Sequence, residues 1–326
     1  WDMEKGVGIT RMVKYEVNAF PTLLFLNSEG ILHRATGARG VKEFIELGET
    51  ALNPEKRFSF WEKKYKQGNR DPAFIRKYLK QLQSAGMEKK EVADWYFVTQ
   101  RKQELLTKEN FEMIEMFVHS YNDSLFDFLL AKRVKYIELA GKENVEKKIY
   151  GVFQHTHVFQ YRDTVVATTE DGMQLINQIA TFDEASYNKV VSKIKSADFE
   201  KKEQLLLAFS ITYYSEKKDW QNYEKAVIKF VNAYLLNDFN DLNYYAWTFY
   251  ENENIKSKEA INAAIGWAKK SVELSNDYAP ADTYAAILFK SGNKKEALNA
   301  AKKAIALGKK NGDDVSSTEG LILKYK

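Results

Sequence analysis

The sequence predicts an α+β protein, in which a partial α/β unit is followed by a large all-α region of helical hairpins. A proline stands directly before an apolar run at residues 22–26, helical periodicity dominates from residue 54 onward, and the last part of the chain repeats at a spacing of 33 residues. With only 4 prolines and 16 glycines among 326 residues, long helices are favoured over a loop-rich sheet protein. We expect three parts, at residues 1–53, 54–235 and 236–326.

The composition narrows the classes of partner. Hydrophobic residues make up 44% of the chain and charged residues 29%, as in globular proteins. The net charge of +4 is small for this length, and lysine interleaves with glutamate, which is typical of solvated helix faces rather than of a nucleic-acid-binding stripe. No apolar run approaches the ~20 residues that span a bilayer. We therefore expect no nucleic-acid partner and no membrane span.

The chain contains no cysteine. It therefore has no disulfide, no thiolate nucleophile and no thiolate metal site of its own. The sequence begins at Trp1 without a basic and apolar leader, so we expect any targeting segment to have been removed or left out.

Residues 1–53 read as mixed α/β. Residues 2–6 are typical of a strand end that enters a helix, whose apolar positions are Ile9, Met12, Val13 and Val17. Because proline cannot donate to a sheet ladder, Pro21 opens the next strand or lies in a special turn. A buried strand over 22–26, a turn over 28–30 and a second strand over 31–35 follow. After Gly37, an amphipathic helix presents its apolar side with Val41, Phe44, Ile45 and Ala51.

This order of elements resembles the C-terminal half of the thioredoxin fold. In that family the proline of the Phe20-Pro21-Thr22 triplet is cis and lies beside the redox-active cysteine pair. The resemblance covers about a sixth of the chain, is specific to the fold rather than to an activity, and makes Phe20, Pro21 and Thr22 the substrate-facing residues. It gives this chain no catalytic residue. The alternative is an ordinary trans proline that opens a strand.

The resemblance also implies that the first half of the fold, with its Cys-x-x-Cys, precedes Trp1 and that this chain is a fragment. A sheet without those strands exposes an apolar edge at Leu23–Leu26, which invites pairing with another chain. If the chain is whole, we expect poor solubility or a dimer through this edge.

From Asn53-Pro54 onward, apolar residues recur at helical spacing. The Asp71-Pro72 pair is a good helix start. Residues 160–180 give no clear signal. The apolar stripes fall at 74–82, 111–121, 125–137 (ended by Gly141), 145–153 and 223–234.

The last part of the chain is self-similar. The pattern Ala264-x3-Ala268-x2-Ser271 recurs as Ala297-x3-Ala301-x2-Ala304, and a Tyr-Ala-x2-Leu/Phe pattern precedes each at Tyr245 and Tyr284. This region resembles tetratricopeptide repeats, whose period is about 34 residues. The resemblance implies a superhelix of helical hairpins over 236–326, and by extension a degenerate one over 54–235.

No metal or cofactor site stands out. His155 and His157 are two apart, which suits chelation poorly on a helix. We expect His119 at a helix edge and His33, with Arg34, to be solvated. Gly6-Val7-Gly8 lacks the third glycine of a dinucleotide fingerprint. Serines and carboxylates form no catalytic motif, and the helical spacing of Trp61, Trp95, Trp220, Trp247 and Trp267 favours core positions.

Two functions follow from the resemblances. In the first, the chain belongs to a thiol–disulfide oxidoreductase or redox-linked chaperone whose helical platform docks protein or peptide clients. In the second, it is a non-catalytic interaction scaffold with a degenerate thioredoxin-like cap. A sugar-binding protein would require several exposed tryptophans on one concave face. Thioredoxin-like proteins with long helical extensions resemble bacterial envelope proteins, which favours a periplasmic or envelope location.

Overall fold

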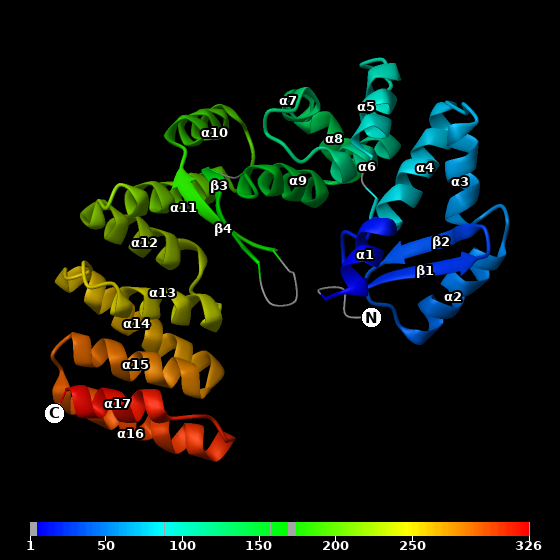
Figure 1. Ribbon diagram of the computed structural model, residues 1–326. Helices are drawn as coiled ribbons and strands as arrows, with labels where there is room; N and C mark the ends of the chain where they lie inside the picture. Colours follow the sequence, from blue (N-terminus) through cyan, green and yellow to red (C-terminus); the bar gives the residue numbers. More distant parts are fainter. Residues whose placement is uncertain (1–4, 88, 157, 169–173, 326) are drawn as a thin grey trace. The chain divides into compact units, whose positions relative to one another are not determined.

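The computed structural model describes residues 5–87, 89–156, 158–168 and 174–325. The protein is α+β with a large helical region (Figure 1): these residues form seventeen helices and two separate two-stranded antiparallel sheets. The chain divides into two compact units, Trp1–Val190 and Val191–Lys326, and each is described by itself. This division differs from the predicted boundaries at 53/54 and 235/236, and β2 packs on the helices that follow residue 53.

Unit 1 opens with the four elements that the sequence predicts over 5–53. Pro21 directly precedes the first strand, and Gly30 opens the second. The apolar position Val17 lies beyond the end of the first helix and is buried, and the predicted strand end at residues 2–6 falls mostly outside the described residues. The elements are α1 (Val7–Lys14), β1 (Thr22–Asn27), β2 (Gly30–Thr36) and α2 (Val41–Leu52).

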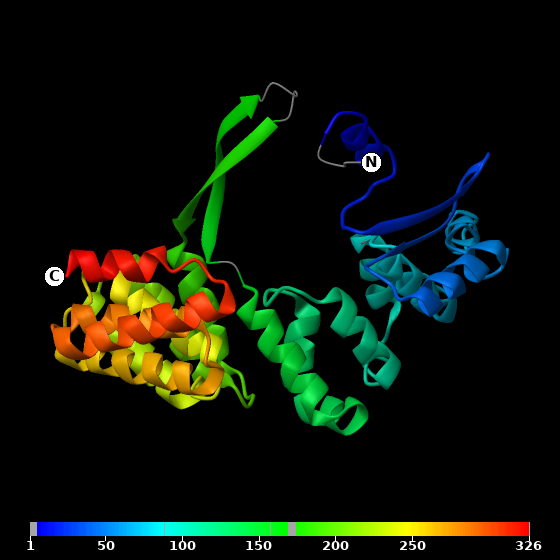
Figure 2. The same ribbon diagram turned by 90° about the horizontal axis from the view of Figure 1, so that it is seen from below.

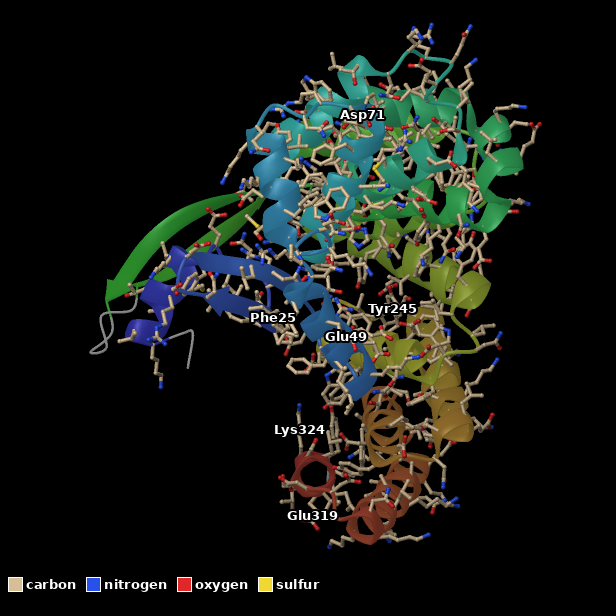
Figure 3. The ribbon with its side chains drawn as sticks, turned by 90° about the vertical axis from the view of Figure 1, so that its right-hand side faces the viewer. Phe25, Glu49, Asp71, Tyr245, Glu319 and Lys324 are labelled. Atoms are coloured by element: carbon tan, nitrogen blue, oxygen red, sulfur yellow. The ribbon has the colours of Figure 1, made fainter. Side chains whose placement is uncertain are left out.

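Strands β1 and β2 form an antiparallel hairpin in which Leu24 lies opposite Arg34 and Phe25 lies opposite His33. Since side chains alternate along a strand, these two pairs face opposite sides of the sheet. The ring of Phe25 lies 6.3 Å from that of Phe44 on α2, so this side is covered by α2. Figure 3 shows Phe25 beside this helix.

The hairpin is anchored to α3 (Phe58–Lys66) and α4 (Pro72–Ser84) by buried polar side chains. Arg34, only 2% exposed, donates from Nε to the carbonyl oxygen of Ala85, just past the end of α4. His33 is also buried, and its Nδ1 accepts a hydrogen bond from the Phe58 N–H at 3.0 Å. The prediction that His33 and Arg34 are solvated is wrong, because helices later in the chain cover both faces of β2.

The remainder of unit 1 is helical except for one hairpin. Asp71 starts α4 as predicted, with Oδ1 accepting from the Phe74 N–H at 2.9 Å. The stripe expected over 125–137 is split between two helices at Lys132, and Gly141, with a φ of 88°, ends the second. The helices are α5 (Lys90–Thr99), α6 (Lys108–Phe117), α7 (Ser124–Ala131), α8 (Arg133–Ala140), α9 (Lys142–Gln154) and the first half of α10 (Glu184–Ser196), within which unit 2 begins.

A long β-hairpin interrupts the helices between α9 and α10. Its strands are β3 (Phe159–Thr168) and β4 (Gln174–Phe182), antiparallel with Phe159 opposite Phe182 (Figure 2). The expectation of an all-α region over 54–235 is therefore wrong at this point. The sequence holds a hairpin signal, since Asp171-Gly172 separates two runs rich in β-branched residues.

Unit 2 consists of helices that follow one another in sequence order (Figure 1). The 33-residue sequence repeat falls on α14 and α16, and the Tyr-Ala patterns fall on α13 and α15, so one repeat is one helix pair. Small residues such as Ala264 and Ala297 are fully buried, which lets paired helices approach closely. The helices are α11 (Lys202–Glu216), α12 (Trp220–Tyr234), α13 (Phe239–Glu251), α14 (Lys258–Ser275), α15 (Tyr278–Lys290), α16 (Lys294–Asn311) and α17 (Ser316–Lys324).

Two polar contacts tie successive pairs together. The ammonium group of Lys290, on α15, donates to the carbonyl oxygens of Phe249, Tyr250 and Asn252 at the end of α13. A cation is favourable there because the last carbonyls of a helix carry partial negative charge. On the other side of α15, Asp282 accepts a hydrogen bond from Thr318 on α17.

Within the described ranges, no helix combines the length and the hydropathy that are needed to cross a bilayer.

Candidate functional site

The candidate site is built around Pro21, at the start of β1. The Phe20–Pro21 peptide bond is cis, the geometry expected from the sequence. The Pro21 carbonyl oxygen accepts a hydrogen bond from the Gly37 N–H at 2.9 Å, and the Thr22 hydroxyl donates to the Ala19 carbonyl oxygen at 2.6 Å. The first contact holds the residue before β1 against the loop that follows β2, and the second closes the turn that leads into β1.

A groove of about 300 Å³ lies beside Pro21. Its floor is formed by Pro21 and Leu23, one wall by the loop after β2, and the other wall by the first turns of α2. Gly37 has a φ of 92°, in the left-handed region that favours glycine, so the loop can turn sharply at the edge of the groove. The lining residues of α2 are Val41, Phe44 and Ile45.

The apolar side chains at this groove are exposed to solvent. Val41 is 81% exposed, Ile45 57% and Phe44 50%, and Phe20, next to Pro21 in the sequence, is 61% exposed. The sequence predicts the first three to lie on the buried side of their helix, yet only Ala51 of that side is buried. Contiguous exposed apolar side chains are typical of interaction sites.

Strand β1 contributes an unpaired edge to the same region. Among the described residues it forms a ladder with β2 alone, so its other edge presents backbone N–H and C=O groups without strand partners. Such an edge can accept an extended peptide by adding it to the sheet. The apolar groove would then take alternate side chains of the added strand.

The charged groups at the groove are few. Arg39 is exposed, and its guanidinium donates to the Thr36 carbonyl oxygen at 2.9 Å. Glu43, in the first turn of α2, lies close to Gly40: an added Cβ on Gly40 would meet its carboxylate oxygen at 2.5 Å. The groove is thus mainly apolar, with one cation and one anion at its rim.

The buried anchors of β2 keep the groove in place. Arg34 donates to the carbonyl oxygens of Tyr15 and Glu16 as well as to Ala85, so one guanidinium connects the end of α1 to the end of α4. Burial lowers the pKa of this guanidinium, and the nearby carboxylates of Glu16 and Glu62 oppose the shift. Burial also lowers the pKa of His33, which keeps its Nδ1 available as an acceptor.

The other residues considered from the sequence do not join this site. His119 is exposed, just beyond the end of α6, and His155 lies with Nδ1 at 2.7 Å from the Gly151 carbonyl oxygen. His157 lies outside the described residues. Gly6-Val7-Gly8 forms the start of α1. In the described part of the chain, no three His, Cys, Asp or Glu side chains are grouped to hold a metal ion.

The five tryptophans of the described helices belong to the packing. Trp267 is buried and donates from Nε1 to Asn232 at 2.8 Å, and the others are half-buried. Trp61, for example, stacks on Phe74 with ring centres 5.6 Å apart. None of the five is exposed, so the condition set for a sugar-binding face is not met by tryptophan in these residues.

Comparison of the chain with protein-family models, with curated proteins and with solved structures finds no match.

Of the three residues that the triplet predicts to face a substrate, only Pro21 lines the groove, and Phe20 and Thr22 are not among its lining residues. Val41, Phe44 and Ile45 stand out from the sequence only as the apolar stripe of a helix, which is normally a core signal. The sequence predicts only two strands beside this helix. Two strands are too few to bury its whole apolar stripe, which indicates that part of the stripe is exposed.

Proposed function

We propose that this chain binds protein or peptide clients, with an extended segment of the client lying in the groove at Pro21. The observation that carries the proposal is the combination of exposed apolar side chains on α2 with the unpaired edge of β1. A client strand on that edge gains backbone hydrogen bonds. Its apolar side chains are removed from water when they contact Val41, Phe44 and Ile45.

The helical region is the second part of the proposal. Its helix pairs in unit 2, with their 33-residue repeat, support a tetratricopeptide-like platform for protein interaction. Such repeats stack into extended binding surfaces. In this proposal the groove holds an extended segment of the client, and the repeats offer further contact area.

The thioredoxin-like resemblance adds a redox possibility. The order β1-β2-α2 after Pro21 supports it, and disulfide exchange would require a cysteine pair that none of these 326 residues supplies. A Cys-x-x-Cys in sequence encoded before Trp1 would favour an oxidoreductase or redox-linked chaperone. Its absence there would favour the second candidate, a non-catalytic scaffold.

The experiment uses the full chain and a fluorescent peptide with alternating apolar and polar residues. Binding is measured by anisotropy for the wild type and for Val41→Asp and Ile45→Asp, whose side chains are 81% and 57% exposed. Val134→Asp, at a 67% exposed position on α8, is the control. We expect at least a tenfold loss of affinity for the groove variants, about 1.4 kcal/mol, and none for the control.

Equal affinity of Val41→Asp and Val134→Asp would rule the groove out as the peptide site. The alternative is that the β1 edge pairs two copies of this chain. In that case the groove variants would change the mass of the particle in sedimentation and leave its affinity for the peptide unchanged.

A further inference from the structure

A second cavity lies in unit 1, between α5, the end of α6 and the start of α7. It has a volume of about 690 Å³, within the range of small-molecule sites. The candidate site at Pro21 contributes none of its lining residues. We call it the α5–α7 cavity.

The wall of the α5–α7 cavity is mostly apolar. Phe97 and Ala93 of α5 are buried behind it, and Phe117 and Leu125 border it from α6 and α7. Val98 stands at its mouth and is 85% exposed, the largest exposed fraction among the large apolar side chains of the described residues. An apolar group that enters the cavity would remove Val98 and the exposed part of Phe117 from water.

The charges on the cavity are unequal. Its ionisable groups are one lysine, two aspartates and one histidine, Lys90, Asp94, Asp123 and His119, which gives a net charge of −1 with the histidine neutral. The ammonium of Lys90 is already paired with Asp94, at 2.6 Å between Nζ and Oδ2. The cavity therefore has no uncommitted cation for an anionic ligand.

Asp123 is the carboxylate of the cavity that forms no salt bridge with the described residues, although Lys90 lies close enough to interact with its charge. Its side chain is half-buried, and Oδ1 accepts a hydrogen bond from the Leu125 N–H at 2.8 Å as the cap of α7. Its Oδ2 receives no hydrogen bond from the described residues. Because a half-buried carboxylate is less screened than one in open water, a cation beside it gains more than at the surface.

We propose that the α5–α7 cavity binds an amphipathic primary amine. The apolar body lies against Phe97, Phe117 and Leu125, with Val98 covering it at the mouth, and the ammonium group donates to Oδ2 of Asp123. Charge complementarity selects the cationic head group, and the apolar wall selects a chain or ring of several carbons.

The test is calorimetric titration of the full chain with three probes of equal length, octylamine, octanol and octanoate, below the concentrations at which they form micelles. We expect octylamine to bind most tightly, octanol about fivefold more weakly and octanoate more weakly still, since an ion pair at a partly exposed site contributes up to about 1 kcal/mol. Equal or tighter binding of octanoate, or no binding of octylamine, would overturn the proposal.

Two variants locate the site. Asp123→Asn removes the charge but keeps a good helix cap, so the fold is retained and the preference for octylamine over octanol should disappear. Val98→Arg places a bulky cation at the mouth and should lower the affinity for both probes at least fivefold. Val134→Arg, at a 67% exposed position on α8, is the control. If Val98→Arg and Val134→Arg bind octylamine alike, or Asp123→Asn keeps the preference, the site is not this cavity.

Discussion

Arg34, on β2, donates a hydrogen bond from Nε to the backbone carbonyl oxygen of Ala85 at 2.9 Å, across 51 positions of the sequence. The same guanidinium donates to Tyr15 and Glu16 just past α1. One buried cation thus satisfies carbonyl groups at the ends of two helices, where such groups otherwise lack partners. This contact makes the β1–β2 hairpin part of unit 1, and it supports the floor of the groove from behind.

Replacing Arg34 by methionine should therefore destabilise the hairpin. The substitution leaves three carbonyl oxygens without their donor, and we expect a loss of about 2–4 kcal/mol in the opening free energy of the β2 amides, measured by hydrogen exchange. Arg39→Met is the control, because Arg39 is exposed and should change this energy by less than about 0.5 kcal/mol. Equal protection of β2 in both variants would show that the Arg34 contacts are dispensable.

His33 makes the same hairpin sensitive to acid. Burial lowers its pKa in the folded state below the value of about 6.5 that the unfolded chain has. The unfolded state therefore binds a proton first as the pH falls, and folding stability decreases from about pH 6.5 down to the folded pKa, by at most about 1.4 kcal/mol per pH unit. Protonated Nδ1 also could not accept the Phe58 N–H.

His33→Asn keeps an acceptor and does not titrate. Between about pH 7.5 and pH 5, the wild type should lose more β2 protection in hydrogen exchange than this variant. His119→Asn, at an exposed position, should follow the wild type. Coincident pH profiles of wild type and His33→Asn would exclude this role of His33.

Two buried tyrosines should respond to loss of their hydroxyl groups in opposite ways. The Tyr78 hydroxyl is buried and has no hydrogen-bond partner among the described residues, whereas the Tyr136 hydroxyl donates to the Leu105 carbonyl oxygen at 2.9 Å. Tyr78→Phe should stabilise unit 1 by about 0.5–1 kcal/mol, and Tyr136→Phe should cost about 1 kcal/mol. Urea denaturation measures both. A stability loss in Tyr78→Phe as large as that in Tyr136→Phe would mean that the Tyr78 hydroxyl has a partner in solution.

Two helical glycines of unit 2 form a similar pair. A Cβ at Gly308, on α16, would lie 2.5 Å from Val315 and 2.8 Å from the ring of Tyr278, while a Cβ at Gly266, on α14, meets nothing within 4 Å. Gly308→Ala should destabilise by about 1–3 kcal/mol through overpacking. Gly266→Ala should gain about 0.5–1 kcal/mol from helix propensity. Thermal unfolding of the two variants would refute the close contact if both were stabilised.

The sequence predicts those elements whose signals are local. Pro21 and the glycine at position 30 delimit β1 and β2, Asp71-Pro72 starts α4, and the 33-residue repeat falls on corresponding helices of unit 2. These features depend on dihedral angles and spacings within a few residues, which a single sequence reports directly.

The features that the sequence leaves out depend on distant contacts. His33 and Arg34 are polar and adjacent, which is typical of a solvated strand, and only the later helices α3 and α4 bury them. The exposure of the apolar residues of α2 also depends on distant contacts, because an apolar stripe in a sequence does not indicate whether another element packs on it. The β3–β4 hairpin lies between helical segments, and residues 160–180 give no clear periodic signal, although the sequence holds an Asp-Gly pair that is typical of hairpin turns.

The most direct test of the peptide groove is hydrogen exchange of the full chain with and without an excess of the alternating apolar peptide. Bound peptide should slow the exchange of amides in β1 and in the loop over 37–40. Pairing of the peptide with β1 should leave the exchange of amides in α14 and α16 unchanged. Protection confined to unit 2, or none in β1 at a saturating peptide concentration, would contradict a client site at Pro21.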